Sequence, residues 1–570
     1  LTYRQLLQDS EISEEIVLAE PSRDTVQLFT RAPAASRRHI GQMVEQVGIH
    51  DVVTGQAQYS RDARLPDMRF GAVARPAQLG AELIAWDADK ARQVAGVMAV
   101  VEGPDGTPGV VASTPGAAQR GVQALACKWR QLSADQLARV QENLDIDVLI
   151  DRNELEHKPI DNGSLASGRE AAQIQLNERY DTPMAAHAAM EPRAGLAHFE
   201  RRDGTAQCRV WTGSQDPWLV RKAVSRALGI NDERVIVYNH RIGGAFGGRL
   251  LCQASIEAAW LSQAVGEPVK VQWSREEEFA CNYVGPQFST RIEAGLDDTG
   301  NIAYWHHRMA GAPILTSSTF IPRRLHWAAD LVADPGTQRG TELPYAVTNQ
   351  RVEFADVRVP MPTGAWRGLG AAPNTFAVEV AMDELASAAA LEPLAFRAAH
   401  ARDPRLAGVL KRLAELISDE DTPPGVAATA YKGVTFVAVA ASVDVSSGLP
   451  VVTKLWCVHD CGQVVSPDQV LAQIEGNLVW GIGMALTEEF KLADGTPSTL
   501  NFDTYLPPRS LDIPPMQIEM IESDAPPSGA AEAAFAPVAA AIANAVSRAT
   551  GARQRRLPLQ PLAAPGRRQG

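Results

Sequence analysis

The 570-residue chain lacks three features, and each absence argues against a class of protein. Six cysteines are too sparse for a disulfide scaffold. No apolar run reaches the roughly 18–20 residues of a membrane-spanning helix, since the Ala-rich stretch 529–548 is interrupted by Glu532 and Pro537. No long basic run occurs before the C-terminal end, and 54 basic against 67 acidic residues give a net charge of −13. We therefore expect no nucleic-acid partner, because nucleic-acid binding depends on a positive surface.

What the chain does contain is the composition of an ordinary packed protein, with 45% apolar and 21% charged residues. Since the first residue is Leu1 rather than Met, we expect preceding polypeptide, either on a cleaved precursor or on another chain. The pattern of strand-like and helical stretches predicts five segments: 1–45 as the tail of an earlier unit, a small mixed α/β domain 46–135, a larger domain 136–405, a linker 406–430 and a second larger domain 431–570.

Two cysteines with a histidine between them, Cys457, His459 and Cys461, raise the question of a zinc site. No second pair of ligands follows at the spacing of a zinc finger, and the alternation of residues in 455–458 is typical of a strand. We therefore predict that these are buried structural cysteines.

A strand-like run, 234–238, is followed by a glycine-rich turn, 243–249, and an apolar helix, 251–265. A dinucleotide fingerprint fails, because Ala245 and Phe246 stand where that motif needs glycine. A phosphate loop fails as well, because no Lys-Ser/Thr pair follows the last glycine. What remains is an aromatic ring between two glycine pairs, which lets the backbone approach a ligand closely. A tight structural turn explains the segment about equally well.

Three more segments carry polar groups suited to a binding site. A second glycine-rich turn, 363–370, holds Arg367, whose planar guanidinium suits an oxyanion or oxo group. Gln215 ends a strand with a side-chain amide just before a predicted helix, 217–228. Glu532 is a single carboxylate among small apolar residues, for which interaction with a helix dipole is the structural alternative.

In this order, the four segments resemble those of the molybdenum-binding large subunits of the xanthine dehydrogenase and aldehyde oxidase family. The resemblance extends over roughly residues 1–560, and the stretches 188–192 and 501–505 are most similar to the isoquinoline 1-oxidoreductase-like type. Other matching stretches are 53–68, 377–385, 460–462, 473–476 and 541–545. The resemblance implies an α+β fold with a hammerhead-like small domain, 46–135, followed by two larger mixed α/β molybdopterin-binding domains.

The resemblance also implies a molybdopterin-type molybdenum cofactor, with the cytosine dinucleotide form as one candidate, and no direct side-chain ligand to the metal. Glu532 matches the catalytic glutamate, a base that takes a proton from a metal-bound hydroxyl, and we expect its carboxylate to point into a buried pocket. Phe246 and Arg367 should converge on one small volume. The positions that match the cofactor pocket are Gln215, Gly244, Ala245, Phe246, Gly247, Arg367 and Gln473, and those that match the substrate pocket are Leu250 and Trp366.

Three departures from the family pattern bear on function. Alanines at 530, 531 and 533 surround Glu532, where relatives have glycine and proline. Leu250 stands where purine-oxidising relatives carry a glutamate, so we expect an aldehyde or N-heteroaromatic substrate rather than a purine. No Gly-Gln-Gly-x-x-Thr loop occurs in the chain, and we expect an accompanying chain or segment to carry that pterin-binding loop. A non-catalytic relative, acting as a scaffold or assembly partner, is the alternative.

The chain lacks the cysteine groupings that hold iron–sulfur clusters. The resemblance therefore implies 2Fe-2S clusters on a small partner subunit, which receive the electrons of a reaction that takes its oxygen from water. A cytochrome c is one candidate acceptor beyond them. Because isoquinoline-type relatives often carry a twin-arginine leader, we expect a periplasmic or membrane-associated protein, with the cytoplasm as the alternative.

Overall fold

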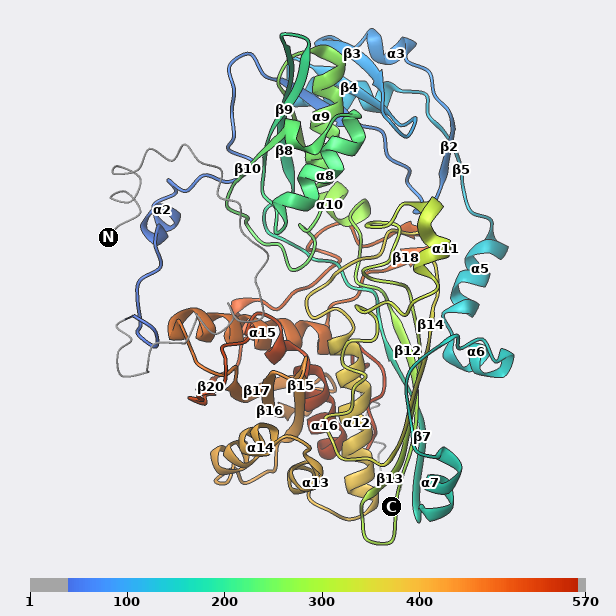
Figure 1. Ribbon diagram of the computed structural model, residues 1–570, viewed down its shortest axis with the longest axis vertical. Coiled ribbons are helices and arrows are strands. Elements are labelled where there is room, and N and C mark those ends of the chain that lie inside the picture. The colour runs from blue at the N-terminus through green and yellow to red at the C-terminus, as the bar shows by residue number, and fades with distance from the viewer. Residues whose placement is uncertain (1–38, 562–570) are drawn as a thin grey trace, which may run out of the picture.

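A computed structural model describes residues 39–561, so most of the predicted N-terminal segment, 1–38, lies outside the described residues. The chain forms two lobes along the long axis of the molecule (Figure 1). The upper lobe in that view contains a seven-stranded sheet, and the lower lobe contains a five-stranded and a four-stranded sheet. None of the helices in 39–561 is long and apolar enough to cross a membrane.

The sheet of the upper lobe joins two distant parts of the chain. Its order is β10-β9-β8-β11-β1-β4-β3, and β1 pairs with β11 in parallel through Arg69 and Val269. The strands are β1 (Arg69–Val73), β3 (Val97–Glu102), β4 (Pro108–Ala112), β8 (Ala194–Arg202), β9 (Thr205–Thr212), β10 (Val235–Asn239) and β11 (Val269–Gln272). Because strands from before and after residue 135 share this sheet, the predicted boundary between 46–135 and 136–405 is wrong.

Two helices that the sequence predicts cover this sheet, α8 (Pro217–Leu228) and α9 (Gln253–Val265). The carboxylate of Asp216 caps α8 by accepting from the amide of Leu219, and the helix ends at Gly229. The smaller elements beside the sheet are β2 (Glu82–Ala85), α3 (Asp89–Arg92), α4 (Pro115–Ala124), β5 (Lys128–Arg130), η3 (Asp232–Arg234) and α10 (Arg275–Ala280). β2 pairs with β5.

The lower lobe is built around one central helix, α12 (Ala371–Ala388), which is buried along nearly its whole length. It contacts β7 and β12 of the five-stranded sheet and β15 of the four-stranded sheet. The first sheet has the order β6-β14-β13-β12-β7 and consists of β6 (His157–Asn162), β7 (Ile174–Thr182), β12 (Phe288–Leu296), β13 (Ile302–Gly311) and β14 (Asn349–Asp356). A helix that is apolar on all sides fits this position between two sheets.

The second sheet has the order β15-β16-β17-β20 and carries the C-terminal helices. Its strands are β15 (Gly425–Tyr431), β16 (Thr435–Asp444), β17 (Val451–Asp460) and β20 (Met516–Met520). α16 (Val538–Thr550) packs against β15 and β16, and α14 (Pro404–Leu416) packs against β16 and β17. α13 (Pro393–His400) precedes α14, and α15 (Pro467–Leu486) follows β17.

The predicted linker, 406–430, is wrong. It holds most of α14 and nearly all of β15, and Leu406, Val409, Leu410 and Leu413 of α14 are buried in the main core. Pro and Gly near residue 423 marked a turn correctly, but this turn connects two packed elements within one domain. The prediction for the cysteines is confirmed, since Cys457 lies in β17 and both Cys457 and Cys461 are buried.

Short elements complete the described chain and connect the sheets. They are α2 (Ile49–Val53), α5 (Ala134–Asn143), α6 (Ile146–Arg152), α7 (Leu165–Ala171), η4 (Arg323–Leu325), α11 (His326–Ala329), β18 (Leu492–Ala493), β19 (Thr496–Pro497), η5 (Ser510–Asp512) and η6 (Ala533–Phe535). The α5 and α6 helices run down the side of the molecule from the upper lobe to the lower lobe (Figure 1).

Candidate active site

The first glycine-rich turn, 243–249, leads from β10 toward α9 and packs directly on the second. Its backbone has positive φ at Gly244 (104°), Phe246 (52°) and Gly247 (100°). A Cβ atom at Gly247 would lie 2.1 Å from the carbonyl oxygen of Ala365 in the second turn. Only glycine therefore allows this close approach of the two turns. The hydroxyl of Tyr283 donates to the carbonyl of Gly247, 2.6 Å away, and fixes the turn.

A buried group of charges lies beneath this turn. Arg193 and Glu278 have side chains that are 0% and 3% exposed, and their nearest charged atoms are 2.9 Å apart. Arg193 also donates to the carbonyl of Gly248 at 3.1 Å. Although burial acts in the opposite direction, the guanidiniums of Arg193 and Arg249 lower the pKa of Glu278 to about 2. The carboxylate is therefore ionised and ties the turn to α10.

The second glycine-rich turn, 363–370, presents Trp366 and Arg367 in different directions. Trp366 is only 6% exposed, its indole N–H donates to the carbonyl of Ala186 at 3.1 Å, and its ring meets Phe535 edge to face at 5.2 Å. Trp366 thus supports the turn from beneath, and its contact with substrate stays a prediction.

The Arg367 guanidinium connects this turn to the segment that carries Glu532. Its Nε and Nη2 donate to the carbonyl of Ala531 at 3.0 and 2.7 Å, and Nη2 also donates to Oε1 of Gln473 at 3.1 Å. Burial lowers the pKa of Arg367 to about 10, which still leaves it charged at neutral pH. The side chain therefore fixes the backbone directly before Glu532.

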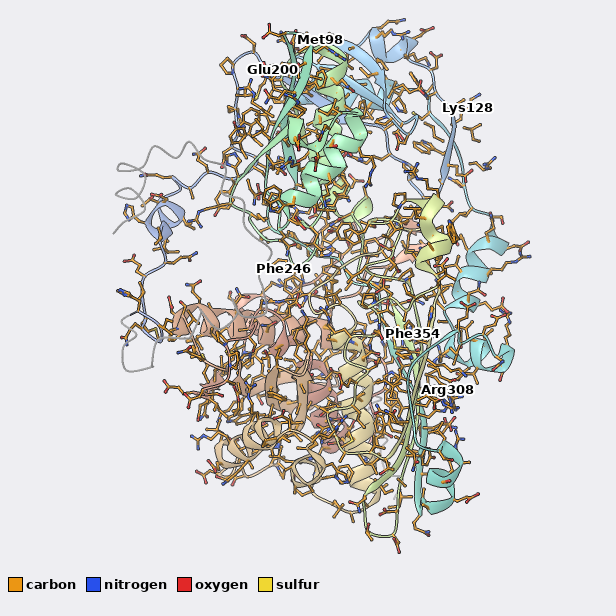
Figure 2. The ribbon with its side chains drawn as sticks, viewed as in Figure 1. Met98, Lys128, Glu200, Phe246, Arg308 and Phe354 are labelled. Atoms are coloured by element: carbon orange, nitrogen blue, oxygen red, sulfur yellow. The ribbon has the colours of Figure 1, made fainter. Side chains whose placement is uncertain are left out.

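Phe246 and Arg367 do converge, as the sequence predicts. The guanidinium carbon of Arg367 lies 5.9 Å from the centre of the Phe246 ring. Both contact Trp480 of α15, whose ring centre is 4.1 Å from that of Phe246. Figure 2 shows Phe246 between the two lobes. Sequence analysis missed Trp480, because a lone tryptophan in an apolar helix is indistinguishable from a core residue.

Gln215 orients its amide against the first turn. Its Oε1 accepts from the backbone amides of Gly247 at 3.1 Å and Arg249 at 3.3 Å. The side-chain NH₂ group has no protein partner within 39–561, and the residue is exposed. Leu250, three residues after Gly247, is half-buried and packs against the apolar cluster around Phe288, so the wall of the site there is apolar.

Glu532 begins the short helix η6, and Oε2 of its carboxylate is held by two residues of the lower lobe. The hydroxyl of Tyr431 donates to Oε2, and Nη1 of Arg339 lies 3.9 Å from the same oxygen. Burial and the charge of Glu532 raise the pKa of Tyr431 well above its usual range, so its hydroxyl remains a donor. The Glu532 side chain is 34% exposed, and the expectation of a fully buried carboxylate is wrong.

Tyr431 and Arg339 have no sequence signal that could have revealed them. Tyr431 is the last residue of β15 and Arg339 lies in an irregular loop, 335–342, so only the tertiary fold brings them to Glu532. Among the described residues, no group of three or more His, Cys, Asp or Glu side chains is placed to hold a metal ion.

Comparison with known proteins assigns the family. Two family models, both described as molybdopterin cofactor-binding domains, match residues 150–401 and 347–514. The chain is 30% identical to the beta chain of isoquinoline 1-oxidoreductase from Brevundimonas diminuta, over 94% of this chain and 70% of that protein. The chain belongs to the molybdenum-binding large subunits of the xanthine dehydrogenase family. These are molybdenum-dependent oxidoreductases, as their names state.

Two further similarities define how far the match extends. The molybdenum-binding chain is 30% identical to one of the subunits of nicotinate dehydrogenase from Pseudomonas putida, covering 92% of itself but 46%, or about half, of that protein. The solved structure of quinoline 2-oxidoreductase from Pseudomonas putida 86 superimposes with a TM-score of 0.79 at 17% identity, covering 92% of this chain and 97% of that chain. This agreement confirms the predicted multi-domain α+β fold.

The residues around Phe246 fit a cofactor of this family. The indole N–H of Trp480 is buried without a hydrogen-bond partner, and the Gln215 amide offers a second donor on the same side of the turn. A molybdopterin has oxo and phosphate oxygens that accept such bonds, and the family members in the comparison are named for it. Gln215, Phe246 and Gln473 are thus placed to hold the cofactor between the lobes.

Proposed function

We propose that this chain is the molybdopterin-bearing subunit of a hydroxylase that oxidises an aldehyde or an N-heteroaromatic compound, with water as the source of oxygen. The observation that carries the proposal is the bond from Arg367 to the carbonyl of Ala531, because it joins the two glycine-rich turns to the loop of Glu532. When bound, the molybdenum cofactor supplies the two-electron oxidation.

In this proposal Glu532 is the base that removes a proton from the water-derived group. Only Oε2 of its carboxylate has a partner in the described chain, which leaves Oε1 able to accept the proton. Tyr431 and Arg339 keep the carboxylate ionised and oriented, and Arg367 sets the backbone before it. A positioned base of this kind contributes about 10²–10⁴-fold to the rate.

The proposed substrate class depends on Leu250 and on the relatives. Leu250 gives an apolar wall where a purine needs a polar partner. The relatives are named for nicotinate, isoquinoline and aldehydes. We therefore favour flat N-heteroaromatics and aldehydes over purines.

Partners and location complete the proposal. Iron–sulfur clusters of the 2Fe-2S type lie on a small subunit, a segment outside this sequence supplies the pterin-binding loop, and a cytochrome c is one candidate acceptor. The cofactor takes the cytosine dinucleotide form in this proposal. The complex works in the periplasm or at the membrane, with the cytoplasm as the alternative. Fractionation of cells, followed by mass spectrometry of the purified complex, tests each of these points.

The experiment that tests the function uses the purified complex with its partner subunits. Molybdenum content is measured first, and substrates are then added without oxygen while the absorbance of the iron–sulfur clusters is followed. Bleaching by quinolines, nicotinate or aldehydes, but not by purines, supports the proposal. Stoichiometric molybdenum with no bleaching by any of these compounds contradicts it.

One observation favours the alternative of a non-catalytic scaffold. The carboxylate of Glu532 is 34% exposed and flanked by alanines, so its position depends on few contacts. A scaffold would form the complex without retaining molybdenum. The metal content of the purified complex therefore separates the two candidates.

A further inference from the structure

A cavity of about 480 Å³ lies next to Glu532 and is not part of the cofactor positions. It is bounded by β6, β14 and the start of α12, by the loop 335–342, and by the turn between β15 and β16. Tyr431 and Arg339 line it, and the same two side chains contact the Glu532 carboxylate. The cavity therefore lies on the Tyr431 side of Glu532, whereas Arg367 and Gln473 lie on the Ala531 side.

The charged side chains of this cavity are predominantly cationic. Arg339, Arg402 and Lys432 line it together with a single carboxylate, that of Glu342. Within residues 39–561, neither Arg402 nor Lys432 has a carboxylate oxygen within 4.0 Å, because only Arg339 among the three forms an ion pair, with Glu532. Arg402 and Lys432 thus retain their charge for a ligand.

Two further features make the cavity suitable for an anion. Gln350 of β14 is 4% exposed, and its buried Nε2 has no hydrogen-bond partner although the residue lines the cavity. Ala371, the first residue of the 18-residue helix α12, also lines it, so the positive end of the helix dipole faces the same space. A buried amide donor without a partner costs free energy, which a bound acceptor group would recover.

We propose that this cavity binds the carboxylate of the substrate, with Arg402 and Lys432 as its charge partners and Gln350 as a hydrogen-bond donor. The substrate is then an aromatic aldehyde or an N-heteroaromatic compound that carries a carboxylate. Its reacting carbon faces Glu532, and its carboxylate extends past Tyr431 into the cavity. This inference rests on the proposed function, because it takes Glu532 to be the base. The volume suits a molecule of one or two rings.

The same anion chemistry could come from a phosphate of the cofactor. The cavity does not include Gln215, Phe246, Arg367 or Gln473, the positions assigned to the cofactor. For this reason we assign the anion to the substrate, and the experiment below measures the cofactor separately.

The test compares charged and neutral ligands on the purified complex. Binding of nicotinate and its neutral analogue nicotinamide is measured by titration calorimetry, and turnover of 4-formylbenzoate and 4-formylbenzamide is measured in parallel. The double variant Arg402→Gln/Lys432→Gln should weaken binding of nicotinate at least about thirtyfold, because it removes two charge-assisted contacts, and that of nicotinamide about threefold or less. For 4-formylbenzoate, KM should rise with a smaller change in kcat.

Two control variants accompany the double variant. Lys128→Gln removes an exposed cation in the upper lobe, far from Phe246 in Figure 2, and should leave both ligands and the activity unchanged. Arg402→Lys/Lys432→Arg keeps the charges and should restore nicotinate binding to within about fivefold of wild type. Restoration would exclude misfolding as the cause of the loss.

Each remaining outcome is decisive. Equal affinity of the wild-type complex for nicotinate and nicotinamide would overturn the inference, and so would loss of molybdenum or pterin in the glutamine double variant. Selective binding of nicotinate without any turnover would support the anion site and contradict the proposed function. Turnover of aldehydes with no preference for the carboxylate would do the reverse.

Discussion

The two sides of the candidate site differ in how firmly they are held. The turn 243–249 rests on the buried pair Arg193 and Glu278, and its glycine allows close contact with the second turn. The loop of Glu532 is one third exposed and is held by Tyr431, Arg339 and Arg367. We infer that the cofactor side is preformed and rigid, while the base depends on a few orienting contacts. The two sides should therefore fail differently when they are changed.

The largest effect is expected from Glu278→Gln, which breaks the buried pair beneath the turn. Removing one partner leaves Arg193 buried with an uncompensated charge, which costs about 3–5 kcal/mol of stability. We expect a lower melting temperature and a reduced molybdenum content. Glu142→Gln breaks an exposed ion pair with Arg152 and serves as the control, since such pairs contribute about 1 kcal/mol or less. Equal melting temperatures of the two variants would contradict a rigid, charge-supported turn.

Glu532→Gln should give the opposite pattern. Turnover should fall at least about a hundredfold, because the proton acceptor is lost, while the melting temperature and molybdenum content stay unchanged. Glu156→Gln, an exposed carboxylate outside the site, is the matched control. Steady-state kinetics with metal analysis measures both properties, and a turnover within threefold of wild type would rule out Glu532 as the base.

A smaller effect is expected from Tyr431→Phe, which removes the hydroxyl that orients Oε2 of Glu532. Because the carboxylate remains but is less well positioned, kcat should fall about three- to tenfold. Removal of its phenol should leave the molybdenum content intact. If kcat did not change, the bond between Tyr431 and Glu532 would have no role in orienting the base.

The smallest effect is a difference in acid stability. The pKa of Glu278 is lowered from 4.5 to about 2, so the ionised carboxylate stabilises the fold above pH 4.5. This contribution is lost as the pH falls from 4.5 toward 2. The difference in melting temperature between wild type and Glu278→Gln should therefore narrow over that range, as measured by calorimetry. A constant difference would contradict the assignment.

Sequence analysis predicted those parts of the site whose local chemistry is unusual. Phe246 and Arg367 could be paired in advance because glycines on either side of each allow close backbone approach. Helix α8 was predicted with its bounds because Pro217 and Gly229 mark its two ends.

The remaining parts depend on tertiary contacts that no local pattern records. Arg193 and Glu278 are far apart in sequence from the turn they support, and Tyr431 meets Glu532 only through the packing of β15. The boundary at residue 135 was missed because β1 pairs with β11, a strand from much later in the chain. The segment 406–430 was misassigned because its prolines and glycine outweighed the amphipathic pattern of α14.

The central claim is that Phe246, Arg367 and Glu532 surround one molybdenum centre. Anomalous scattering from crystals of the purified complex, recorded on both sides of the molybdenum absorption edge, locates the metal directly. We predict a single peak between the two lobes, bordered by Phe246 and by the side chain of Glu532. A peak elsewhere in the molecule, or one from which Glu532 is separated by other side chains, would contradict it.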